Sequence, residues 1–122
     1  MNLTIYERLK QAAVDQKLLT YSELAAAIGL RLTGDGALKA LGTILDEIAE
    51  HELANGRPLL PVVIVREQTN MPGSGLFRFA KKKGLMGTKT EVEYFAQELS
   101  RVYAEWQKTA QGQDASKYGC HK

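Results

Sequence analysis

Cysteine is nearly absent from this chain: Cys120 is the one thiol among 122 residues, so no internal disulfide can form. Long apolar runs are absent as well. The longest, residues 59–65, is far shorter than the roughly 20 residues that a membrane-spanning helix needs. At the N-terminus no basic segment precedes an apolar one, as a secretory signal would require. We therefore expect a cytoplasmic protein that does not contact a membrane.

The residue patterns of catalytic and metal sites are also missing. His51 lies beside Glu52, but no second histidine follows at the spacing that a helical zinc site requires. The segment Gly73-Ser74-Gly75 lacks the flanking glycines of a nucleophile elbow, and is typical of a turn whose amides can hold an anion. The sequence therefore predicts a non-enzymatic protein with no catalytic residues, no metal and no cofactor.

The chain does contain enough apolar sequence for a folded domain. Hydrophobic residues make up 44% of it and charged residues 25%, which is typical of a globular protein. No internal repeat or long linker divides it. We expect one domain over residues 1–110, followed by a flexible tail of small and polar residues over 111–122.

Capping residues and apolar spacing predict four helices. Capping boxes begin three of them, at Thr4, Thr20 and Thr90, because each threonine is followed three residues later by glutamate. Asp35 is the expected N-cap of another, the third in the chain, which ends near Asn55. Two helices carry an amphipathic stripe, formed by Leu38, Leu41, Leu45, Ile48 and Ala49 in the third and by Val92, Phe95, Ala96, Leu99, Val102, Tyr103 and Trp106 in the last.

A β-ribbon is predicted between the third and the last helix. Residues 59–65 form the one strongly β-branched apolar run, and Pro58 and Pro61 favour an edge position or a start with a bulge, because proline cannot donate to a ladder. Residues 68–75 are typical of a hairpin loop. The alternation of Phe77 and Phe79 around Arg78 predicts a returning strand, with both phenylalanines packed in the core rather than stacked on bases.

This order of elements predicts an α+β fold that is winged-helix-like. Three helices form the core, the two-stranded β-ribbon forms the wing, and a C-terminal amphipathic helix packs against them. The second and third helices, joined by a short turn with glycines, fit a helix-turn-helix. Their periodicity alone fits an ordinary αα-hairpin equally well.

Residues 19–29, Leu-Thr-Tyr-Ser-Glu-Leu-Ala-Ala-Ala-Ile-Gly, resemble the start of the helix-turn-helix in the DNA-alkyltransferase family and its alkyltransferase-like relatives. Residues 36–42 are similar to the small-residue beginning of that family's recognition helix. Leu60-Pro61 falls at the family's Leu-Pro segment, and the resemblance covers residues 19–75. It implies a DNA-binding domain of the winged-helix type.

The chemistry of that family is not implied, because its reactive segment is absent. The family carries Pro-Cys-His-Arg-Val, or Pro-Trp-His-Arg-Val in its non-enzymatic branch. Here Pro61 is followed by Val62, Val63 and Ile64, so the site has no thiol to accept an alkyl group and no histidine to activate one. Alkyl transfer at this position is therefore excluded.

Charge is distributed unevenly along the chain, although the formal net charge is only +2. Residues 66–89 hold six cations against Glu67 alone, whereas residues 35–53 hold five acids against Lys39 alone. A basic ribbon and an acidic helix are therefore predicted. These charges are equally compatible with ordinary solvated surfaces.

Two functions fit this pattern. The first is DNA binding through the front of the third helix and the basic wing, since cations hold phosphates. Its candidate residues are Arg31, Thr33, Lys39, Thr43, Arg66, Arg78, Lys81, Lys82 and Lys83. The second is a protein-interaction module, such as an adaptor, inhibitor or immunity protein, whose acidic helix binds a basic protein partner.

Overall fold

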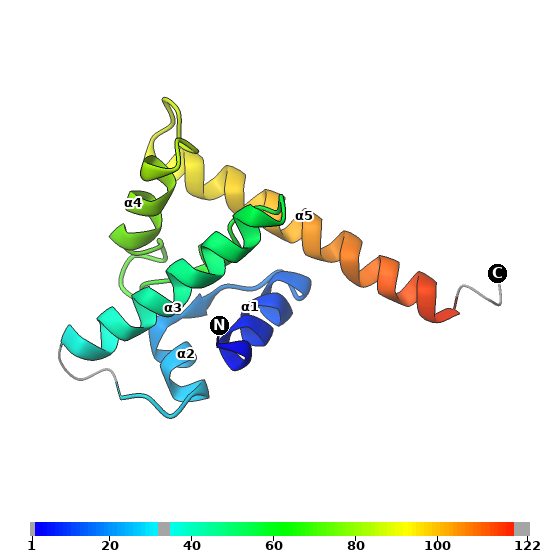
Figure 1. Ribbon diagram of the computed structural model, residues 1–122, viewed down its shortest axis with the longest axis horizontal. Helices are drawn as coiled ribbons and strands as arrows, with labels where there is room; N and C mark the ends of the chain where they lie inside the picture. The colour runs from blue at the N-terminus through cyan, green and yellow to red at the C-terminus, as the bar shows by residue number, and fades with distance from the viewer. Residues whose placement is uncertain (1, 32–34, 119–122) are drawn as a thin grey trace.

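The computed structural model describes residues 2–31 and 35–118, without the side chains of Asp35 and of residues 109–118. Within these residues the chain is mostly helical with a small two-stranded sheet, an α+β arrangement in the general sense (Figure 1). The described helices are α1 (Leu3–Val14), α2 (Tyr21–Ala27), α3 (Asp35–Ala54), α4 (Ser74–Lys82) and α5 (Glu91–Tyr118). A 3-10 helix, η1 (Leu60–Val63), and the strands β1 (Leu19–Thr20) and β2 (Ile64–Val65) complete the described elements.

Residues 59–65 lie at the centre of the fold, where every side chain of the segment is buried. η1 packs against α1, α3 and α5. Burying each large aliphatic side chain contributes about 1.5–3 kcal/mol, so this segment is a main source of stability. The prediction of a buried run is confirmed. The prediction of a continuous strand is wrong, because Pro61 lies in the first turn of η1 and its fixed φ favours a helical turn there.

The predicted wing is also wrong. β2 pairs in parallel with β1, which places Leu19 opposite Ile64 and Thr20 opposite Val65. The partner of β2 is therefore the short strand before α2 and not a returning strand of a hairpin. Residues 76–79, where the second strand of the ribbon was predicted, lie within α4.

α4 is a helix because its apolar residues also recur at helical spacing. Phe77, Phe79 and Ala80 are buried and Leu76 is half-buried, so three- and four-residue steps connect them on one face. The helix ends before Gly84, which has the left-handed φ of +71° that suits a helix terminus. Core packing of both phenylalanines is confirmed, although they pack from a helix.

Two of the three predicted capping boxes are confirmed. At the start of α2, Glu23 accepts a hydrogen bond from the backbone amide of Thr20 at 2.9 Å, and the Thr20 hydroxyl accepts one from the amide of Glu23. The same reciprocal pair joins Thr90 and Glu93 before α5. The box predicted at Thr4 is wrong, because α1 begins earlier and the side chain of Asn2 accepts from the amide of Ile5.

The two amphipathic stripes are confirmed along their middle turns and wrong near their starts. Leu38 is 50% exposed and Val92 is 64% exposed, and Ala96 is exposed as well. The first turns of α3 extend past the neighbouring elements (Figure 1), so its stripe begins to be buried at Leu41. In α5 the buried face includes Tyr94 and the later Val102 and Trp106.

α5 connects distant parts of the chain. It packs against α1 and η1, and the Tyr103 hydroxyl donates to the carbonyl of Lys17 at 3.0 Å. The C-terminal part of α5 extends away from the other elements, and its backbone is helical as far as Tyr118 (Figure 1). The division into a domain over 1–110 and a tail over 111–122 stays a prediction. No helix in the described ranges is long and apolar enough to cross a membrane.

Two buried carboxylates, those of Glu52 and Glu98, form hydrogen bonds with Arg57 and Leu59, at the start of the central segment. Glu52 is fully buried, accepts from the Tyr6 hydroxyl at 2.9 Å, and forms two hydrogen bonds with the guanidinium of Arg57, at 3.1 and 2.9 Å. Glu98, from α5, accepts from the backbone amide of Leu59 at 2.7 Å and from Arg101 at 2.8 Å. α1, α3 and α5 are thereby joined to the residues that enter η1.

Removing the Glu52 carboxylate should destabilise the protein. Glu52→Ala leaves the part-buried guanidinium of Arg57 without its charge partner, and we expect the free energy of unfolding to fall by about 3–5 kcal/mol. Urea unfolding at neutral pH measures this change. Glu47→Ala, which removes an exposed acid from the same helix, should stay within about 0.5 kcal/mol of wild type. Equal stability of the two variants would contradict the assigned role.

Tyr6 should make stability depend on alkaline pH. Burial, with the hydrogen bond to Glu52, raises the pKa of its hydroxyl from 10.0 to about 12. The fold favours the protonated form, so this contribution is complete below pH 10 and is lost as the pH rises towards 12. Tyr6→Phe should be less stable than wild type by about 1 kcal/mol at neutral pH. In urea unfolding, that difference should shrink from pH 10 to 12, and a constant difference would refute the linkage.

Candidate nucleic-acid interface

A groove with a volume of about 600 Å³ lies where the beginnings of α2, α3 and α4 meet the turn after β2. It is open to solvent, and three glycines, Gly42, Gly73 and Gly75, lie on its surface. The residues that line it are Tyr21, Ser22, Leu38, Lys39, Gly42, Arg66, Glu67, Gln68, Gly73, Ser74, Gly75 and Arg78. Segments that are distant in the sequence therefore form one concave surface.

Three cations from three different segments converge on this groove. Lys39 belongs to the second turn of α3, Arg66 follows β2 directly, and Arg78 lies in α4; all three are exposed. Glu67 is the one acid among the lining residues. The N-terminus of α4, where Gly73 provides no side-chain cap, adds backbone amides and the positive end of a helix dipole. The groove is thus suited to an anion.

Tyr21 fixes the start of α4 against α2. Its hydroxyl accepts a hydrogen bond from the Gly73 amide at 3.3 Å. A Cβ atom at position 73 would lie 2.8 Å from that hydroxyl oxygen, so glycine allows the approach. Burial raises the pKa of Tyr21, although the Gly73 amide and the nearby Arg66 charge lower it in part. The hydroxyl is therefore a neutral group that sets the position of the α4 amides.

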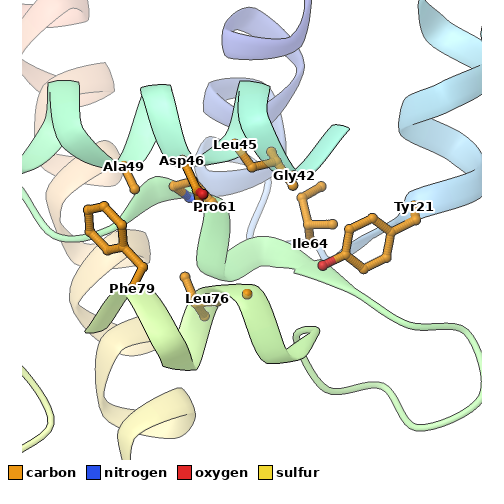
Figure 2. A pocket seen from close by; sticks show the side chains of 10 residues that line it. Tyr21, Gly42, Leu45, Asp46, Ala49, Pro61, Ile64, Leu76 and Phe79 are labelled. Carbon is orange, nitrogen blue, oxygen red and sulfur yellow. The ribbon is translucent and has the colours of Figure 1, made fainter. Parts of the chain in front are cut away.

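A narrower cavity of about 40 Å³ continues from the groove between α3, η1 and α4 (Figure 2). Tyr21, Gly42 and Gly75 line both spaces. Most of the remaining wall is apolar, and Asp46 is the one charged residue among those that line it. Burial raises the pKa of Asp46, while the charges of Arg78 and Lys82 lower it and that of Glu50 raises it.

The predicted basic ribbon does not form one surface, because part of it faces the acids of α3. Lys83 forms an ion pair with Glu50, with 3.0 Å between Nζ and Oε2, and lies over the Phe79 ring. Lys82 is close enough to Asp46 to lower its pKa. Lys81 is exposed near the end of α4. The two charge runs that the sequence predicted as separate surfaces therefore pack side by side.

The other predicted site residues are distributed around the groove. Lys39, Arg66 and Arg78 line it. Arg31 is exposed after α2, and the Thr43 hydroxyl is exposed and donates to the Lys39 carbonyl at 3.1 Å. Thr33 lies outside the described residues.

Sequence reasoning missed several lining residues, chiefly Tyr21 and Gly42. Tyr21 had a local explanation as the first residue of a capped helix, and Gly42 carries no side chain to signal a site. The prediction that the amides of Gly73-Ser74-Gly75 can hold an anion was a usable signal, since these residues line the groove, although they begin α4 and do not form a hairpin turn.

No group of His, Cys, Asp and Glu suited to a metal ion occurs in the part of the chain that the structure describes. The groove combines cations, amides and hydroxyl groups, all of which can donate hydrogen bonds to an anion. Comparison of the chain with protein-family models, with curated proteins and with solved structures finds no match. The function must therefore be argued from the groove itself.

Proposed function

We propose that this protein is a non-enzymatic DNA-binding protein that holds phosphates of the DNA backbone in the groove. The observation that carries the proposal is the convergence of Lys39, Arg66 and Arg78 at the uncapped N-terminus of α4. Guanidinium and ammonium groups with backbone amides are the usual protein ligands of DNA phosphates. Their binding is electrostatic and depends little on base sequence.

The beginning of α3 supports contact with a duplex. Gly36, Lys39, Ala40 and Thr43 are all exposed there, and three of these side chains are small or absent. Small residues let a helix backbone approach a nucleic acid closely, while Lys39 adds charge. The acidic residues of α3 come later in the helix, so the first turns are the part that a duplex accepts.

A winged-helix-like arrangement remains part of this proposal in a modified form. α1, α2 and α3 follow the order of such a core, and α4 takes the place in the chain where a β-wing was expected. Arg78, predicted on the wing, then reaches the groove from a helix.

The geometry favours DNA over a basic protein partner. The alternative needs the acids of α3 as an open surface, but Glu52 is buried with Arg57 and Glu50 is paired with Lys83. Asp46 and Glu47 are exposed as well, but Arg78 and Lys82 lie close enough to Asp46 to lower its pKa, so few of these acids are left without a nearby cation to attract a basic partner.

The proposal predicts salt-dependent binding to duplex DNA of random sequence. Fluorescence anisotropy at several salt concentrations should show affinity at low ionic strength. Lys39→Ala, Arg66→Ala and Arg78→Ala should each weaken it and reduce the slope of log K against log salt by about one. Lys108→Ala, which removes an exposed cation from α5, is the matched control and should leave both quantities unchanged.

A charge reversal at the end of α4 separates the groove from the surface predicted by sequence. Lys81→Glu, Lys82→Glu and Lys83→Glu combined should weaken binding less than the three groove substitutions combined. The reverse order would move the DNA site away from the groove. Absence of any affinity at low salt would refute DNA binding, and a partner from native lysate that survives nuclease and high salt would favour the protein-interaction alternative.

A further inference from the structure

The first turns of α3 and α4 line the groove, whereas their later turns carry opposite charges that lie close together. On α3, Lys39 and Gly42 line the groove, whereas Asp46 and Glu50 follow at successive turns. On α4, Arg78 lines the groove, and Lys82 and Lys83 follow one turn later. The Lys83–Glu50 ion pair shows that the later parts of the two helices lie in direct contact.

Arg78 stands at the boundary between these two regions. Its side chain lines the groove, and its helix neighbour Phe79 lines the narrow cavity that also contains Asp46 (Figure 2). The groove and the cavity share Tyr21, Gly42 and Gly75, so Asp46 is separated from the groove by a single turn of α3. Arg78 and Asp46 also interact electrostatically, as the lowering of the Asp46 pKa by Arg78 indicates.

We propose that Asp46 competes with bound phosphate for Arg78 and so limits the affinity of the groove. This inference rests on the proposed DNA binding. A phosphate that enters the groove gains the attraction of Arg78 but also meets the repulsion of the nearby Asp46 carboxylate. Both side chains are exposed, so both effects weaken as the salt concentration rises.

The neighbouring acids do not compete in the same way. Glu50 is held by Lys83, and Glu52 is buried with Arg57. Glu47 has the same charge as Asp46 and is adjacent in sequence, but it lines neither the groove nor the narrow cavity. The structure therefore offers Glu47 as a matched control that separates a local effect from a change of net charge.

Anisotropy with random duplex DNA, at about 50 mM salt and above, tests the competition. Asp46→Asn keeps the side-chain shape and should raise affinity about two- to fivefold at low salt, which is the size expected of one partly exposed charge pair. Glu47→Gln should change it less than Asp46→Asn. In the Arg78→Ala background, the gain from Asp46→Asn should be clearly smaller, because the part that acts through Arg78 is lost and only the direct repulsion of phosphate remains. Asp46→Ser serves as a second variant, and thermal unfolding confirms that each protein is folded.

Each result decides between the two proposals. If wild type binds and Arg78→Ala weakens binding, but both Asp46 variants bind as wild type does, the competition is refuted and DNA binding stands. An equal gain from Glu47→Gln, or a full gain in the Arg78→Ala background, also refutes the competition. If neither wild type nor Asp46→Asn binds DNA, the proposed function is refuted together with the inference.

Discussion

The fold depends on the burial of residues 59–65. This segment packs against α1, α3 and α5, and it is held at its start by the carboxylate of Glu98 and, through Arg57, by that of Glu52. The end of the same segment is β2, which pairs with β1 immediately before α2. The position of this buried segment therefore determines where Arg66 and the beginning of α2 lie. Both contribute residues to the lining of the groove.

Cations and acids lie close together over part of the surface of this protein. The formal net charge of +2 conceals a run of cations and a run of acids, and the fold brings much of the two together between α3 and α4. What remains at the groove is a small group of cations from separate segments with the amides of α4. Such a surface suits moderate, salt-sensitive binding to phosphates, which is what the proposed DNA binding requires.

Local signals predicted much of the helical structure and part of the site. The capping boxes at Thr20 and Thr90 are confirmed because they depend on residues within one turn of each other. The segment that forms α4 was wrongly predicted as a strand, because Phe77 and Phe79 satisfy both a two-residue and a helical period when their neighbours are included. Lys39, Arg66 and Arg78 were recognised as candidate ligands, but nothing in their spacing indicated that they meet.

The sequence by itself determined the helix boundaries set by local capping, the buried character of residues 59–65 and the absence of the alkyltransferase's reactive residues. Those properties depend on side-chain chemistry and short-range hydrogen bonds. Only the tertiary structure decided that β2 pairs with β1, that Lys83 pairs with Glu50 and that Tyr21 meets Gly73. Such pairings are selected by burial of the whole core, because each residue has many chemically equivalent partners along the chain and only packing brings one of them within reach.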